Sequence, residues 1–304
     1  MEFLTYKELP SKDELLPLFQ HAFWWPFNPE EFEKEIRTDP RLKSSPVGFA
    51  ALKSGRLAGF VGVVDIPTRT LQGSVEKVGG IWGVVTHPAH ARRGICTALM
   101  EKSHNYFKEQ DYRFSLLYTS RILIAHALYQ KLGYKDTLAH SSVYKIMRGR
   151  EKPSKKRTGK AKIDWKKILE LYNQAVKDCT GFVVRDMQYG KGLEARKKFT
   201  PEKTILRDQG YALLKESDGN VNVRELITLK IEETSEIITQ IEKEATKTVI
   251  AENVMDGTLL RAYRSHGYIT LKNGYDLLMS KQLADATFEE TYGSQFFATS
   301  TDFF

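Results

Sequence analysis

Cysteine is scarce in this chain of 304 residues, which contains only Cys96 and Cys179. Two cysteines cannot form the framework of bridges that staples small secreted domains. The sequence also lacks any apolar run near the ~18 residues that a membrane helix requires. Its first residues, MEFLTYKELPSKDELL, do not follow the basic-then-apolar pattern of a signal peptide. These absences predict a cytoplasmic protein without a membrane partner.

The usual nucleotide-binding and metal-binding patterns are missing as well. Neither GxGxxG nor GxxxxGK[ST] occurs. His87, His90 and His126 are not spaced with cysteines or carboxylates as metal ligands are, so we expect no metal site. What the chain does have is 41% hydrophobic and 28% charged residues, which is typical of a folded protein. Its length fits two domains, each able to bury a core.

Positive charge is concentrated in one segment. The net charge is +8, and residues 148–167 alone hold ten Lys or Arg against two acidic residues, so the rest of the chain is balanced. This segment is predicted to be the linker between two domains. A solvated linker is favoured over a nucleic-acid tether, because the segment has a single aromatic residue, Trp165, and no aromatics alternate with its basic residues to stack on bases. We therefore expect no nucleic-acid partner, while the sequence leaves a homo-oligomer open.

The stretch IWGVVTHPAHARRGICT, residues 81–97, predicts an anion site. An apolar strand is followed by a turn with two arginines and then by a helical pattern that begins at Gly94. The first amides of a helix lack intrahelical partners and its dipole is positive there, so such a turn favours a phosphate. Arg92 and Arg93 can add charge-assisted hydrogen bonds. The alternative is an ordinary turn with solvated arginines.

A second strand and helix follow, at residues 112–119 and 121–132, and the helix ends at Gly133. Together VxxHP, RRGIxxALM and AxxLYxKxGY resemble the GCN5-related N-acetyltransferases over roughly residues 47–147. HARRGI is also similar to the turn of the enhanced-intracellular-survival (Eis-like) enzymes, a multi-domain branch that acetylates amines. Three positions depart from the usual pattern: Ala91, Cys96 and Ile122.

The resemblance implies an acetyl-CoA-dependent acetyltransferase of the α+β class, with a mixed, mostly antiparallel sheet flanked by helices. It implies that Tyr129 is the catalytic proton donor. It also implies that acetyl-CoA is held by the end of the first strand, by the turn and by the start of the helix, at Val84, Val85, Thr86, Arg92, Arg93, Gly94, Ile95, Cys96 and Thr97.

The second half of the chain repeats the order of the first. Residues 210–228 are similar to residues 48–66, and residues 262–279 are similar to residues 128–147, with Tyr-x-x-x-Gly-Tyr in both. The pattern indicates an internal duplication. However, the second copy has neither the proline nor the arginine turn, and it places Glu232 and its neighbours at the start of its helix, where they would repel a pyrophosphate.

We therefore predict two tandem domains of one fold. Residues 1–147 would form the catalytic domain, residues 148–167 the linker, and residues 168–304 a degenerate domain that binds no CoA. Relative to the Eis-like enzymes, the chain would be without their C-terminal sterol-carrier-like domain. The second domain would cover the first and shape the acceptor pocket.

The chemistry sets further expectations. A backbone amide at 84–86 would stabilise the charge that develops on the thioester oxygen. Tyr129 would protonate the departing thiolate, since the pKa of tyrosine lies within ~2 units of that of a thiol. Asp65, Glu76 and His87 are candidate general bases, and the resemblance adds the terminal carboxylate of Phe304, or no base at all.

The acceptor would be an amine, either a small molecule or a protein lysine. The aromatic run 23–27 is interpreted as core or lid packing, with a wall of the acceptor pocket as the alternative. Two other classes of function stay open. One is an acyl-CoA-binding regulatory module without turnover, and the other is a basic protein that acts through its linker.

Overall fold

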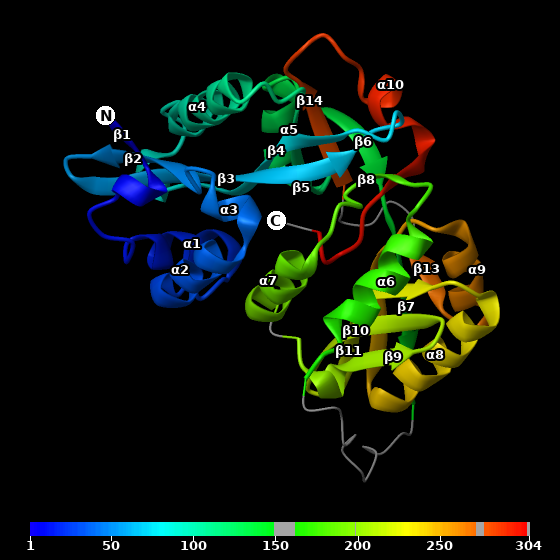
Figure 1. Ribbon diagram of the computed structural model, residues 1–304. Helices are drawn as coiled ribbons and strands as arrows, with labels where there is room; N and C mark the ends of the chain where they lie inside the picture. Colours follow the sequence, from blue (N-terminus) through cyan, green and yellow to red (C-terminus); the bar gives the residue numbers. More distant parts are fainter. Residues whose placement is uncertain (149–161, 198, 272–276, 303–304) are drawn as a thin grey trace. The chain divides into compact units, whose positions relative to one another are not determined.

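The computed structural model describes residues 1–148, 162–197, 199–271 and 277–302. Most of the predicted linker, residues 149–161, lies outside the described residues, and so does Phe304. The chain divides into two compact units (Figure 1). The first unit comprises Met1–Thr137 and Leu278–Ser294, and the second comprises Leu138–Leu277 and the segment from Gln295 onward.

The first unit is a mixed sheet with helices packed on it. The strands follow the order β1-β2-β3-β4-β5-β14-β6. Neighbours from β1 to β4 are antiparallel, whereas β4 and β5 are parallel. Its elements are β1 (Glu2–Thr5), η1 (Tyr6–Glu8), α1 (Leu15–Phe23), α2 (Pro29–Thr38), α3 (Pro40–Lys43), β2 (Gly48–Lys53), β3 (Arg56–Arg69), β4 (Val75–Thr86), η2 (Pro88–His90), α4 (Ile95–Glu109), β5 (Phe114–Thr119), α5 (Ile124–Lys131), β6 (Lys135–Ala139), β14 (Leu277–Gln282) and α10 (Phe288–Tyr292).

The second unit has the same plan. Its sheet has the order β13-β7-β12-β11-β10-β9, and β11 and β12 are again a parallel pair. Its elements are β7 (Ser141–Ile146), α6 (Trp165–Ala175), β8 (Thr180–Gly181), α7 (Met187–Lys197), η3 (Pro201–Lys203), β9 (Thr204–Arg207), β10 (Gly210–Ser217), β11 (Asn220–Thr228), α8 (Ile231–Glu244), β12 (Thr248–Val254), α9 (Gly257–Ser265), β13 (Ile269–Leu271) and β15 (Phe296–Phe297). The short helix η4 (Gly293–Gln295) begins in the first unit and ends in the second.

The two repeats exchange their last strands. β7 follows β6 in the sequence but lies in the second sheet, between β12 and β13. Reciprocally, β14 follows β13 in the sequence but lies in the first sheet, between β5 and β6. The predicted domain ranges, 1–147 and 168–304, therefore do not coincide with the compact units. Contiguous domain ranges assume that each strand pairs within its own repeat, whereas β7 and β14 each pair within the sheet of the other repeat.

Close packing against the first sheet fixes the position of α4. A Cβ at Gly59 of β3 would lie 3.0 Å from the Ile95 side chain and 3.3 Å from that of Leu99, so glycine at this position favours the close approach of the helix. Ile95 and Leu99 are buried and lie one turn apart on the apolar face of α4. In the second unit, Ile237, Ile238 and Ile241 of α8 fill the equivalent place. Among the described helices, none is long and apolar enough to cross a membrane.

Candidate functional site

The parallel strands β4 and β5 separate near their carboxyl ends. Their paired residues run from Gly79 and Ser115 to Ile81 and Leu117, although β4 continues to Thr86 and β5 to Thr119. Beyond this point the β5-facing backbone groups of β4 have no partner in the described part of β5. Such an opening at the carboxyl ends of parallel strands is a common place for a ligand.

A bulge in β4 lies where the opening begins. Gly62 of β3 pairs with Trp82 and Phe60 pairs with Val85, so two residues of β4, Gly83 and Val84, lie opposite one residue of β3. Gly83 has φ +58°, a left-handed conformation that disfavours a side chain. A bulge re-aims the backbone groups around it. It takes the backbone of Gly83 and Val84 out of the regular ladder with β3, where a thioester oxygen could accept from an amide.

The turn after β4 carries the residues predicted to bind phosphate. Arg92 and Arg93 are exposed, and Gly94 is the N-cap of α4 with φ +78°. A Cβ at Gly94 would meet no atom within 4 Å, so the space in front of the helix N-terminus is open. The buried hydroxyl of Thr86, at the end of β4, has no hydrogen-bond partner among the described residues. An open helix N-terminus and two guanidinium groups suit a pyrophosphate.

Tyr129 lies on α5, near enough to Cys96 on the first turn of α4 for the two groups to influence each other's ionisation. Its side chain is buried, yet its hydroxyl makes no hydrogen bond within the described residues. Burial, followed by the effect of Cys96, raises the pKa of Tyr129 above its usual value. The phenol therefore stays protonated at neutral pH, as a proton donor must be.

Cys96 is suited to packing rather than to nucleophilic attack. Burial raises the pKa of its thiol to about 11, so almost none of it is thiolate near neutral pH. A covalent acyl intermediate on this side chain is therefore disfavoured.

The neighbouring Tyr134 packs edge-on against Tyr129 with the ring centroids 6.0 Å apart. The Tyr134 hydroxyl lies 2.6 Å from Ser115 Oγ and 2.9 Å from His104 Nε2, which holds this wall of the site in place.

Two of the candidate bases are engaged elsewhere. Asp65 is buried and accepts hydrogen bonds from the Tyr106 hydroxyl of α4, at 3.2 Å, and from Ser44. Glu76 lies near the start of β4, far along the strand from the opening, and accepts from Tyr292 at 2.9 Å and from Arg113. His87 alone of the three lies at the end of the opening, where it caps η2. Phe304 lies outside the described residues.

The aromatic run 23–27 is split between core and surface. Phe27 is buried, whereas 84% of Trp24 is exposed. The ring of Trp25 packs on Phe27 and lies 6.3 Å from that of Trp82, which belongs to the bulged end of β4. Trp25 therefore connects the first helices to the opening, while Trp24 is free of the core.

The corresponding opening of the second unit is filled by the chain itself. β11 and β12 pair only from Asn220 and Thr248 to Val223 and Ala251. Just beyond, Ser300 accepts a hydrogen bond from Asn253 at 3.1 Å and donates one to the Glu252 carbonyl at 3.2 Å. The segment 298–302 is buried and bonded to both strands there.

A buried ionic cluster fixes this segment. Arg185 donates to Glu225 at 3.0 Å and to Asp302 at 2.8 Å, and all three side chains are almost wholly buried. Thr299 and Thr301 donate to the same Glu225 carboxylate. Burial alone would raise the pKa of Glu225, but Arg185 and these hydroxyls hold it below its usual value. The sequence reasoning missed this cluster, although a glutamate within the apolar strand NVNVRELIT was a signal for it.

The N-terminus of α8, the helix that follows the second opening, carries acidic side chains. Glu232 and Glu233 lie in the first turn of α8, where the first unit has its glycine turn. Glu233 and Glu236 both pair with Arg207 of β9. Carboxylates in the first turn of this helix complement its dipole and would repel a phosphate.

The family match agrees with an acetyl-CoA site at the end of β4 and the start of α4. Residues 9–136 match the sequence profile of the acetyltransferase (GNAT) domain. The first part of the chain is a GNAT acetyltransferase domain. A search of curated proteins found no significant match.

Several solved structures are similar in fold to most of this chain, including both of its units. A GCN5-related N-acetyltransferase from Kribbella flavida has a TM-score of 0.64 at 17% identity, with 93% of this chain and 72% of that chain covered. Eis1 from Mycobacterium abscessus has a TM-score of 0.53 at 18% identity, with 84% and 70% covered. A tandem GNAT protein from the clavulanic acid biosynthesis pathway has a TM-score of 0.52 at 12% identity, with 94% and 99% covered. The predicted fold of two tandem GNAT-like domains is confirmed, and the Eis-like resemblance is consistent with these likenesses.

Proposed function

We propose that the first unit transfers an acetyl group from acetyl-CoA to an amine by direct attack. GNAT domains are acetyltransferases that in general use acetyl-CoA. The observation that carries the proposal is the opening between β4 and β5, with an open helix N-terminus at its mouth and a protonated tyrosine near the start of α4.

Each group has one task in this reaction. Arg92, Arg93 and the amides after Gly94 would hold the pyrophosphate of acetyl-CoA. A backbone amide of the bulge would stabilise the charge that develops on the thioester oxygen. Tyr129 would give its proton to the leaving thiolate and recover one from the acceptor ammonium through solvent. The high pKa of Cys96 supports direct transfer without an acyl-enzyme.

The general base is proposed to be His87 or none. Asp65 and Glu76 have partners that keep them occupied. An amine that enters in its neutral form needs no base, whereas a protonated amine needs one, and His87 is the candidate that lies at the end of the opening. The acceptor would be a small-molecule amine or a protein lysine.

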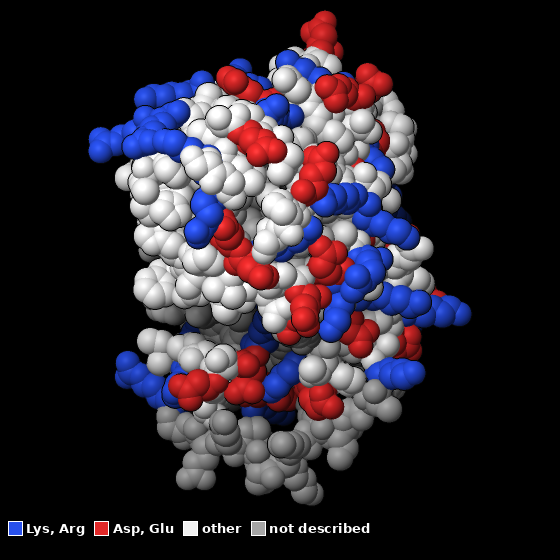
Figure 2. Space-filling model, turned by 90° about the vertical axis from the view of Figure 1, so that its left-hand side faces the viewer, with Lys and Arg blue, Asp and Glu red and all other residues white. Residues whose placement is uncertain are grey.

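Nucleic acid is not proposed as a partner. Figure 2 shows acidic and basic side chains interspersed over the face it presents, and much of that face carries neither kind. A nucleic-acid surface would gather Lys and Arg in one stripe.

A panel of amines tests the proposal. The panel would include a polyamine, an aminoglycoside, an aromatic monoamine and a lysine peptide, each with acetyl-CoA, and release of free thiol would be followed. We expect turnover that saturates with at least one amine. Tight acetyl-CoA binding without thiol release for any amine would instead favour the regulatory module, and absence of binding would refute both.

A further inference from the structure

The strand exchange brings a lysine of the second repeat into the first unit. β14 follows β13 in the sequence, but it lies in the first sheet between β5 and β6 (Figure 1). Its Lys281 donates a hydrogen bond from Nζ to the carbonyl of Leu132, the C-cap residue of α5. Because α5 carries Tyr129, a residue of the second repeat contacts the end of the helix that holds the proposed proton donor.

The contact satisfies the C-terminus of a helix. The last carbonyls of a helix have no intrahelical donor and its dipole is negative there, so a cation is favoured at this position. Gly133 follows Leu132 with φ +89°, and a Cβ on it would lie 3.2 Å from Lys281 Nζ. Glycine at this position therefore leaves room for the ammonium group against the end of α5.

The end of α5 is bonded directly to Tyr129. The carbonyl of Tyr129 accepts from the amides of Leu132 and Tyr134, both at 3.0 Å. The ring of Tyr134 also packs edge-on against the ring of Tyr129. A shift of residues 132–134 would therefore disturb both a backbone contact and a ring contact that orient Tyr129.

The second unit contains the same arrangement. Lys145 of β7, the strand exchanged in the other direction, donates to the carbonyl of His266 at 2.6 Å. His266 is the C-cap residue of α9, and like Leu132 in α5 it precedes a glycine with positive φ. Each exchanged strand thus brings a lysine to the end of one helix in the unit that it joins.

The two lysines differ in their charged neighbours. Lys145 also pairs with Glu242 of α8 at 2.8 Å. The equivalent position of α4, which in both repeats lies 24 residues before the C-cap residue, is Lys108. Burial, followed by Lys108, lowers the pKa of Lys281, although Glu101 raises it in part. Within the part of the chain that the structure describes, Lys281 is therefore bonded to the helix end without a paired carboxylate.

We propose that Lys281 is a positioning residue for the acetyl transfer, contributed to the first unit by the second repeat. By bonding the C-terminal carbonyl of α5, it fixes the turn on which the orientation of the Tyr129 hydroxyl depends. Lys281 acts here through Tyr129, so this role rests on the proposed function. It gives the second repeat a part in the reaction that requires no CoA of its own.

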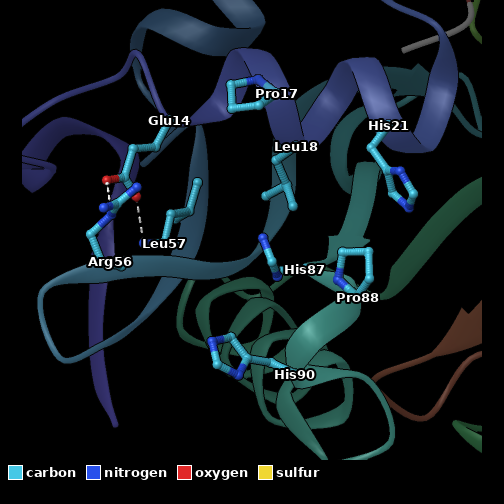
Figure 3. Close-up of a pocket in the computed structure, with 9 residues that line it drawn as sticks. All are labelled: Glu14, Pro17, Leu18, His21, Arg56, Leu57, His87, Pro88 and His90. Carbon is cyan, nitrogen blue, oxygen red and sulfur yellow. Dashed lines mark hydrogen bonds and ion pairs between the residues drawn. The ribbon is translucent and has the colours of Figure 1, made fainter.

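The arginine turn and the pocket beside it do not include this contact. A pocket of about 440 Å³ is formed by α1 with the turn before it, by the start of β3 and by η2, and Figure 3 shows His87, the candidate base, at this pocket. None of the residues that line it belongs to α5 or β14. A change at Lys281 should therefore spare the binding of acetyl-CoA and act on turnover.

Lys281→Met keeps the unbranched stem of the side chain and removes its charge. With the best amine of the panel, kcat should fall about 10-fold while the KM for acetyl-CoA stays within about 2-fold, because small displacements of a catalytic group are costly. Lys281→Arg retains a cation and should recover most of kcat. Steady-state kinetics measures both parameters.

Lys145→Met, the equivalent change in the second unit, is the matched control. It removes the same kind of helix cap but should leave kcat unchanged, since no proton donor is proposed on α9. Unfolding in urea is followed for both Met variants, and each is expected to lose stability. A loss of stability alone therefore does not distinguish the two lysines, whereas a loss of kcat does.

Hydrogen exchange tests the contact without any acetyl transfer. Followed by mass spectrometry, the amides of residues 132–134 should exchange about 5-fold faster in Lys281→Met, the scale expected for a cation lost from a helix C-terminus. Lys145→Met should speed exchange at residues 266–268 instead. Each variant should leave the end of the other helix unchanged.

The proposal is overturned if Lys281→Met keeps the kcat of the unaltered protein, if Lys281→Arg is no more active than Lys281→Met, or if Lys145→Met lowers kcat as far. Unchanged exchange at residues 132–134 in Lys281→Met would overturn it as well. A protein that acetylates no amine would refute the proposed function, whereas the exchange result would still decide whether Lys281 holds the end of α5.

Discussion

Tyr129 shows how one residue can be buried and still be available. Its ring is held by Tyr134, which in turn is fixed by Ser115 and His104, whereas its own hydroxyl has no protein partner in the described part of the chain. The second unit has an equivalent tyrosine, Tyr263, whose buried hydroxyl has no partner among the residues that the structure describes and lies inside an apolar core. The two tyrosines therefore make a matched pair, one at the opening and one within a core.

Replacement of Tyr129 by Phe keeps the ring and removes only the hydroxyl. If Tyr129 is the proton donor, kcat should fall about 10²-fold or more with CoA affinity nearly unchanged, because general acid catalysis contributes on that scale. Steady-state kinetics with the best amine and calorimetry with CoA measure the two quantities. Tyr263→Phe is the control and should leave kcat unchanged. Near-normal turnover of Tyr129→Phe would show that water or another group protonates the thiolate.

At the scale of elements, local sequence predicted most strands and helices but not all of their partners. The turn with Arg92, Arg93 and Gly94 was predictable because glycine and a helix start leave a local signature. The predicted helix at 121–132 is found as α5, from Ile124 to Lys131. The exchange of β7 and β14 was not predictable, because pairing depends on long-range geometry that an alternating strand pattern does not encode.

Substitution of both Arg92 and Arg93 by Ala tests the arginine turn. CoA affinity should fall by about 1–3 kcal/mol per lost charged hydrogen bond, as measured by calorimetry. Lys230→Ala, at the N-cap of α8 in the second unit, is the control and should bind CoA normally. Unchanged affinity in the double variant would mean that the arginines are only solvated.

The strand exchange makes each unit depend on the other repeat. A specific protease site inserted between residues 148 and 162 would cut the chain into two pieces, each of which supplies one strand to the sheet of the other. We expect the cut protein to elute as one species in gel filtration and to unfold in a single transition, because separation would break both sheets. Two folded pieces that elute separately would contradict the exchange.

At the scale of the whole molecule, the two units share a plan but differ at the opening. In the first unit the space before α4 is open. In the second, the segment 298–302 bonds to both strands, and glutamates bound to Arg207 occupy the start of α8. The sequence indicated the glutamates, but it did not reveal the C-terminal segment, since nothing local marks Ser300 as a partner of Asn253.

Counting bound CoA tests the central claim most directly, because it requires no acceptor. Native mass spectrometry of the full-length chain with excess CoA should show one CoA per chain, and the Arg92/Arg93 double Ala variant should show little or none. Two CoA per chain would contradict the closed second opening. One CoA per chain that the double variant retains in full would place the donor away from the arginine turn, and no bound CoA at all would contradict an acetyl-CoA-dependent enzyme.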